Sequence, residues 1–223
     1  MEFDQKVLVV RFSSIGDIVQ STSPLKTIRN AYPDAQITFL TLDDYASILE
    51  LHPDIDFLLS INRNKTLKEI WDLCEYIEKK EYSFIFDLHN SIRSNILLLR
   101  SKGINYKLKK PRLNRFLLFF FHFNRFNSSF SSLKMFHEHL GAIWKVGDKI
   151  PPTSLFVSQH EKAMAKNMLM SKGVFDQFIA VVPGAAWKQK QWSVSNYIET
   201  LNQIDLPCVL IGSKQIKFVK IFH

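Results

Sequence analysis

A carboxylate stands at position 17, directly after an apolar run and the short turn SSIG. The pattern predicts that a buried strand, residues 7–12, passes into a helix that starts near Asp17. Open α/β folds bind ligands at this carboxyl edge of their strands, and a helix N-terminus favours an ionised acid. Asp17 is therefore a candidate base that is ready to accept a proton. The alternative is a carboxylate that only stabilises the helix, by about 0.5 to 1 kcal/mol. The turn has one glycine and no GK[ST], so it does not predict a phosphate loop.

A second candidate is the segment PGAAWKQKQW, residues 183–192. Here the chain leaves a predicted strand through three residues with small side chains or none, Gly184, Ala185 and Ala186. A ligand could approach such a backbone closely. Lys188 and Lys190 stand beside this opening, and a lysine ammonium suits a phosphate group. The alternative is an ordinary polar loop anchored by two tryptophans.

These residues need a scaffold, and the first 100 residues alternate strand and helix patterns. Strands are expected at 7–12, 37–41, 57–61 and 82–88, with helices at 17–31, near 45–51, after Thr66 and at 91–101. Thr66 with Glu69, and later Ser158 with Glu161, form capping boxes that mark helix starts. Continuous apolar strands that alternate with helices predict an α/β fold with a parallel sheet covered on both faces.

The segment VGDKIPP, residues 146–152, has the composition of a linker and predicts a boundary between domains 1–150 and 151–223. Beyond it we expect a helix that ends at Gly173, strands at 178–184 and 208–212, and a helix near 195–203 between them. This is the opening of a second Rossmann-like domain. With about 70 residues and two clear strands it is shorter than a complete domain of this kind.

The composition of the 223 residues is that of a folded protein, with 46% hydrophobic residues. Cys74 and Cys208 lie far apart inside apolar patterns, which predicts buried, reduced thiols. No signal peptide and no apolar segment long enough to span a bilayer is recognised. We therefore expect a cytoplasmic protein.

The net charge of +8 is unevenly distributed. No acidic residue occurs between Asp87 and Glu138, whereas ten basic residues do: Arg93, Arg100, Lys102, Lys107, Lys109, Lys110, Arg112, Arg115, Arg125 and Lys134. Such a segment suits an anionic partner, which could be phosphate groups, lipid headgroups or nucleic acid. We expect no nucleic acid, because no recognisable binding module occurs and the charge is confined to one stretch.

Three motifs together resemble one family. The opening VLVVRFSSIGDIVQSTSPLKTIRNAYPDAQITFLT is similar to the N-terminal signature of the lipopolysaccharide heptosyltransferases, glycosyltransferase family 9. PGAAWKQKQW is similar to the P-G-A-x-x-x-x-K-x-W segment of that family. FDLHNSIRSN, residues 86–95, is similar to its D-L-Q-x-x-x-[RK]-S step, with His89 in place of the usual Gln. The resemblance extends to about Gly212.

The resemblance implies a GT-B fold with an N-terminal acceptor-binding domain and a C-terminal nucleotide-sugar-binding domain, both Rossmann-like, the second incomplete. It implies transfer of a heptose from ADP-heptose to a lipopolysaccharide core or lipid A-type acceptor, with inversion and without an essential metal or other cofactor. The family's base corresponds to Asp17 and its donor-phosphate lysine to Lys190. Gly184, Ala185 and Ala186 would bind the donor through the backbone. Three further positions would bind the acceptor: Ser14, Gly16 and Arg93.

The same resemblance bears on KLKKPRLNRFLLFFFHFNRF, residues 107–126. If the acceptor is a phosphorylated lipid, the cations would meet headgroups and the phenylalanines would lie at the interface, as a peripheral contact with the inner face of the cytoplasmic membrane. The alternative is a helix whose Phe face packs into the core.

One family segment has no counterpart, because D-[ST]-G-x-x-H occurs nowhere in the sequence. Two hypotheses therefore stand. The first is a heptosyltransferase-type enzyme. The second is a truncated, catalytically silent remnant that at most binds an anionic lipid or glycan through its first domain. Whether this chain alone is an active enzyme stays open at this point.

Overall fold

The computed structural model describes residues 5–185 and 188–212. The chain divides into two compact units, residues 1–156 and 157–223. The division lies beyond position 150 because the following residues bond to the first unit. Ser23 Oγ donates a hydrogen bond to the Pro151 carbonyl, and the Ser154 N–H donates to Thr22 Oγ1 at 2.9 Å. The binding roles assigned to the two domains stay predictions.

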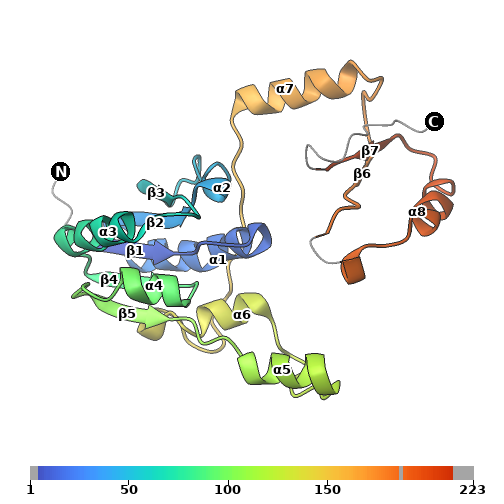
Figure 1. Ribbon diagram of the computed structural model, residues 1–223. Helices are drawn as coiled ribbons and strands as arrows, with labels where there is room; N and C mark the ends of the chain where they lie inside the picture. The colour runs from blue at the N-terminus through green and yellow to red at the C-terminus, as the bar shows by residue number, and fades with distance from the viewer. Residues whose placement is uncertain (1–4, 186–187, 213–223) are drawn as a thin grey trace. The chain divides into compact units, whose positions relative to one another are not determined.

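The first unit contains a five-stranded parallel sheet in the order β3-β2-β1-β4-β5 (Figure 1). Its strands are β1 (Lys6–Val10), β2 (Gln36–Leu42), β3 (Phe57–Ile61), β4 (Phe84–Asp87) and β5 (Ile104–Lys107). The parallel sheet predicted from the alternating pattern is thus confirmed. The edge strand β5 was not predicted, because its residues are exposed or half-buried and form no apolar run.

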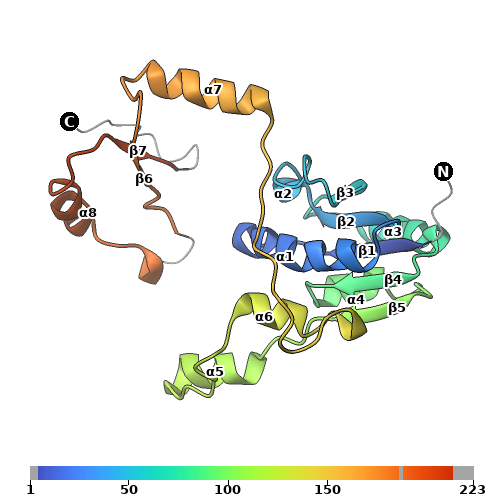
Figure 2. The same cartoon turned by 180° about the vertical axis from the view of Figure 1, so that it is seen from behind.

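Helices cover both faces of this sheet (Figures 1 and 2). The helices of this unit are α1 (Ile15–Ala31), α2 (Asp43–Ala46), α3 (Leu67–Lys80), α4 (Ile92–Leu97), α5 (Arg112–Phe121) and α6 (Ser132–His137), followed by the 3-10 turn η1 (Gly141–Ile143). Of these, α5 does not cover the sheet. Strand β1 shows why both faces need cover. Its residues Val7 and Val9 pack in one cluster with α1 and α6, and its residues Leu8 and Val10 pack in another with α3 and α4.

Both predicted capping boxes are present. The Thr66 N–H donates to Glu69 Oε2 at 2.7 Å, and the Glu69 N–H donates to Thr66 Oγ1 at 3.3 Å. In the second unit, Ser158 and Glu161 make the same reciprocal pair at 2.7 and 3.0 Å. These bonds satisfy N–H groups that have no partner within the helix, so α3 and the later helix α7 begin where the sequence predicts.

The second unit consists of α7 (Gln159–Met170), β6 (Ile179–Val181), the 3-10 turn η2 (Lys188–Lys190), α8 (Val194–Leu201) and β7 (Cys208–Leu210). β6 and β7 pair in parallel as a two-stranded sheet. Gly173 adopts φ +80°, a left-handed conformation suited to glycine, and turns the chain after α7 as predicted. Among the described residues of this unit, the buried hydrophobic side chains are Val174, Val181 and Cys208.

The two cysteines are buried and free, as predicted from the pattern around them. Within residues 5–185 and 188–212, no helix combines the length and the apolar character that crossing a membrane requires.

The contrast between two phenylalanines provides a test of the core. Phe39 on β2 is fully buried, whereas Phe119 on α5 is 76% exposed. We expect Phe39→Ala to lower the free energy of unfolding of the first unit by about 3 to 5 kcal/mol, because it removes packed atoms and leaves a cavity. Phe119→Ala should change it by no more than about 0.5 kcal/mol. Urea denaturation followed by circular dichroism measures both values, and equal losses would contradict this assignment of the core.

Candidate active site

The candidate site lies where the strand order of the sheet reverses. From β1 the chain builds β2 and β3 on one side and then β4 and β5 on the other. The connections that follow β1 and β4 therefore diverge, and such a point leaves a crevice at the carboxyl edge of a parallel sheet. Val10 and Asp87, the last residues of the two strands, stand opposite each other in the register. Residues just after them consequently meet.

A cavity of about 300 Å³ opens at this point. Its walls come from the end of β1, the start of α1, the turn after β4, the segment that leads into α5, and α6. The lining residues are Arg11, Ser13, Ser14, Asp17, His89, Leu108, Lys110, Arg115, Ser132, Met135 and Phe136. The structure thus brings two predicted site residues, Ser14 and Asp17, together with side chains from sequence positions about 100 residues away.

Asp17 is anchored through one of its two carboxylate oxygens. Oδ2 lies 2.5 Å from Arg11 Nη2 and accepts hydrogen bonds from Ser14 N–H and Ser14 Oγ at 3.2 and 3.3 Å. In the part of the chain that the structure describes, no hydrogen bond reaches Oδ1. The side chain is 42% exposed. Asp17 therefore closes the first turn of α1 and also presents a carboxylate oxygen that is available to accept a proton. The two interpretations of this residue are compatible.

Arg11 holds the anchor in place, and the sequence analysis did not identify it. Its side chain is only 5% exposed. Nη1 donates to the Leu88 carbonyl at 2.5 Å, and the guanidinium carbon lies 5.4 Å from the centre of the Phe136 ring. Burial lowers the pKa of Arg11, and the nearby carboxylate of Asp17 opposes that effect. The sequence did contain a signal for Arg11, since it is a basic residue directly after a buried apolar run. A cation at such a position is buried and therefore requires a partner.

Asp87 builds the turn after β4. It is fully buried, and its Oδ1 accepts the N–H groups of His89 and Asn90 at 3.0 and 2.8 Å. Its Oδ2 accepts a hydrogen bond from Ser94 Oγ at 2.8 Å. These three bonds fix the backbone that carries His89 into the cavity, so Asp87 is a positioning residue for this wall.

His89 contributes a neutral side chain to the cavity. Burial, together with the nearby cations Arg11 and Lys110, lowers its pKa to about 4. Its ring packs edge-on against Phe12 with the ring centres 5.0 Å apart. At neutral pH the imidazole is therefore uncharged, as the amide of the glutamine expected at this position would be.

The charge of the lining is predominantly positive. Arg11, Lys110 and Arg115 line the cavity, and Asp17 is the one carboxylate among its lining residues. Lys110 and Arg115 make no ion pair within the described residues, whereas Arg11 pairs with Asp17. Burial, with Arg11 and Arg112 nearby, lowers the pKa of Lys110. An anionic group would relieve this crowding of cations.

The other two predicted acceptor residues lie outside this lining. Gly16 is exposed in the first turn of α1, and a Cβ built on it would meet no atom within 4 Å. Arg93, near the start of α4, donates from Nη2 to the Arg63 carbonyl at 2.8 Å. Gly16 therefore leaves open space beside Asp17, and Arg93 is not part of the cavity.

In the second unit the predicted donor residues follow β6. Gly184 is exposed, Ala185 is half-buried, and the Ala185 carbonyl accepts a hydrogen bond from Gln191 Nε2 at 2.9 Å. Lys190 is exposed on η2. Ala186 lies outside the described residues. The loop thus presents open backbone and a lysine in the same segment.

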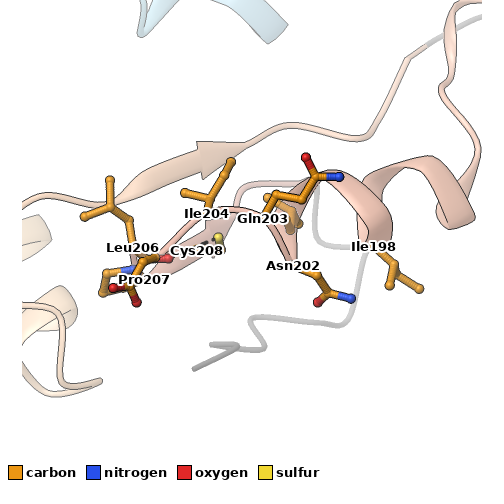
Figure 3. Close-up of a pocket in the computed structure, with 9 residues that line it drawn as sticks. Ile198, Asn202, Gln203, Ile204, Leu206, Pro207 and Cys208 are labelled. Atoms are coloured by element: carbon orange, nitrogen blue, oxygen red, sulfur yellow. Dashed lines mark hydrogen bonds between the residues drawn. The ribbon is translucent and has the colours of Figure 1, made fainter.

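A larger cavity of about 490 Å³ lies elsewhere in this unit (Figure 3). It is lined by residues from Ile198 on α8 to Cys208, the first residue of β7. This position is the amino end of β7, whereas ligands of parallel α/β sheets bind at the carboxyl ends. Since Gly184, Ala185 and Lys190 are not among its lining residues, we do not assign the donor to this cavity.

The state of His89 predicts a pH dependence of stability. Folding lowers its pKa from the ordinary value of 6.5 to about 4. Between these values the unfolded chain binds a proton that the folded chain does not, so this contribution to stability is present above pH 6.5 and is lost as the pH falls toward 4. We expect His89→Gln to lose less stability than the wild type between pH 7 and pH 4.5, as measured by urea denaturation. Equal losses in the two proteins would contradict the burial of a neutral His89.

No family model matches the sequence. Two curated proteins are similar to it. Lipopolysaccharide heptosyltransferase 1 of Campylobacter coli is 26% identical over 138 residues, which are 61% of this chain and 40% of that protein. Lipopolysaccharide core heptosyltransferase OpsX of Haemophilus influenzae is 22% identical over 216 residues, 90% of this chain and 57% of that protein. The chain thus spans about half the length of these relatives.

Solved structures agree with the sequence relatives in fold. A glycosyl transferase family 9 protein from Veillonella parvula matches with a TM-score of 0.73 at 18% identity, over 96% of this chain and 65% of that one. ADP-heptose lipopolysaccharide heptosyltransferase II of E. coli matches with a TM-score of 0.68 at 20% identity, over 95% and 65%. The resemblance seen in the motifs is therefore confirmed, and the chain has the GT-B-type fold of the family 9 heptosyltransferases.

Proposed function

We propose that this chain is a glycosyltransferase of the lipopolysaccharide heptosyltransferase type. It would transfer a heptose from ADP-heptose to a lipopolysaccharide core or lipid A-type acceptor, with inversion at the anomeric carbon. The observation that carries the proposal is the placement of Asp17. Asp17 lines a basic cavity at the carboxyl edge of β1, and its Oδ1 accepts no hydrogen bond from the described residues. The chain resembles these transferases in its motifs.

In the proposed reaction Asp17 Oδ1 takes the proton of an acceptor hydroxyl group. The hydroxyl oxygen attacks the anomeric carbon of the donor as the bond between that carbon and the nucleotide diphosphate breaks. The diphosphate leaves with the bonding electron pair, and a single displacement inverts the configuration. The ion pair with Arg11 holds the carboxylate of Asp17 in place before the acceptor binds.

The donor would bind to the segment after β6. Lys190 would stabilise the negative charge that develops on the leaving diphosphate. Gly184, Ala185 and Ala186 would let the donor approach the backbone. The exposure of Lys190 and Gly184 supports this assignment. An E. coli heptosyltransferase, WaaC, whose structure is also similar in fold, with a TM-score of 0.57, was solved with ADP.

The acceptor would carry anionic groups. Lys110 and Arg115 line the same cavity as Asp17 and make no ion pair within the described residues, and phosphate or carboxylate groups of a lipopolysaccharide core would neutralise their charge. Ser14 and Gly16 would border the reacting hydroxyl group. Arg93 would contact an outer part of the acceptor, since it lies outside the cavity lining. We propose a location on the cytoplasmic side of the membrane that holds such an acceptor.

Replacement of the base tests the reaction. We expect Asp17→Asn to reduce the rate of heptose transfer from ADP-heptose by about 10²- to 10⁴-fold, because the amide cannot accept the proton. Asp72→Asn is the matched control, since Asp72 is an exposed aspartate on α3 and makes no ion pair within the described residues. Transfer to a lipopolysaccharide core acceptor measures both rates, and urea denaturation verifies that both variants are folded. Near wild-type transfer by folded Asp17→Asn would contradict the role of Asp17, and no transfer by folded wild type would contradict the proposed function.

A further inference from the structure

Helix α5 and the residues around it are exposed. No residue from Lys109 to Lys134 is buried. In Figures 1 and 2, α5 lies beyond the β5 edge of the sheet and covers neither of its faces. The interpretation that this Phe-rich helix packs into the core is therefore wrong. A helix with this composition on the surface needs a different explanation.

Large apolar side chains dominate this exposed segment. Leu113, Phe116 and Phe120 follow one another at helical spacing and are 63%, 49% and 63% exposed. Further exposed side chains of this group are Leu118, Phe119, Phe121, Phe123 and Phe130. The rings of Phe116, Phe119, Phe120 and Phe121 contact one another, for example those of Phe116 and Phe120, whose centres are 4.8 Å apart. The rings thus form an apolar patch on the surface of the first unit.

Basic residues frame this patch without any acidic residue. They are Lys107, Lys109, Lys110, Arg112, Arg115 and Arg125. Within the described residues, none of these six cations makes an ion pair with a carboxylate, although Arg11, Lys26, Arg29 and several other cations of the chain do. A partner that is complementary to the patch and its frame therefore has an apolar region directly beside anionic groups.

One class of partner fits both properties. A second copy of the chain would bring an equal positive charge against this frame. A nucleic acid would match the cations but would leave the leucine and phenylalanine side chains in water. An anionic bilayer accepts apolar side chains at its interfacial depth and attracts Lys and Arg to its headgroups.

We propose that residues 107–126 form a docking surface for an anionic phospholipid bilayer, with α5 lying in the plane of the interface. Arg112 and Arg125 would contact headgroups, and Phe119, Phe120 and their neighbours would enter the acyl boundary. Arg115, which lines the cavity beside Asp17, directly precedes Phe116 on the same helix. Docking therefore brings the mouth of the cavity to headgroup level. The placement of the cavity at headgroup level rests on the proposed function, in which a lipid-linked acceptor must reach Asp17.

Co-sedimentation with vesicles tests the docking surface. We expect the chain to bind vesicles of phosphatidylcholine and phosphatidylglycerol and to bind phosphatidylcholine vesicles much more weakly. Arg112→Gln and Arg125→Gln should each weaken binding roughly fivefold. Lys172→Gln is the control for charge, since Lys172 is an exposed lysine of the second unit. The double variant Phe119→Ser/Phe120→Ser should abolish measurable binding, whereas Phe175→Ser, at a phenylalanine that is 69% exposed, should bind normally.

Several results would overturn this proposal. They are the absence of vesicle binding by the folded chain, binding that ignores lipid charge, and normal binding by the Phe119→Ser/Phe120→Ser variant. A dimer that dissociates in that variant would assign the patch to a second copy instead. The cavity residues are unchanged in these variants, so their transfer to a soluble, lipid-free acceptor should equal that of the wild type. Vesicle binding without any transfer would count against the proposed function and would leave the docking surface supported.

Discussion

The parallel pairing of β1 with both β2 and β4 is the constraint on which the rest of the first unit depends. It places a strand with four fully buried residues at the centre of the sheet, so helices must cover both faces. As a result, the segments that follow β1 and β4 both leave the sheet at its carboxyl edge, beside each other. The site could form only at that edge, because there the connections diverge and leave space.

Arg11 connects the elements that meet at this edge and fixes the position of Asp17. A buried guanidinium needs partners, and its partners come from the Leu88 carbonyl, the Asp17 carboxylate and the face of Phe136. These contacts join the start of α1, the turn after β4 and α6. The proposed base is thus held by interactions that the fold itself requires. Asp87 has a comparable role one strand away, where its carboxylate fixes the turn that carries His89. Burial then keeps His89 neutral, and the net positive charge of the cavity resides on Lys110 and Arg115.

Sequence reasoning was most successful where burial dictates composition. The strands β1, β2, β3 and β4 and the capped helices α3 and α7 were predicted, because apolar runs and capping boxes are local signals. β5 and α6 lack such signals and were missed. Asp17 was identified through its motif. For Arg11 the sequence signals only that a buried cation needs a partner, and the roles of Asp87 and Lys110 depend on which strands pair, which no local pattern shows. The Phe-rich segment shows the same limit, since its pattern suits a core helix and a surface helix equally. Only its place beyond the sheet distinguishes the two.

Use of a nucleotide sugar by this chain is tested most directly by calorimetric titration of the purified chain with ADP. We expect saturable binding by the wild type and by Lys166→Ala, a matched control at an exposed lysine on α7. Lys190→Ala should bind about tenfold more weakly or worse, because it loses a charged hydrogen bond to phosphate. Absence of binding by the folded chain, or equal affinity of the two variants, would contradict the use of a nucleotide sugar.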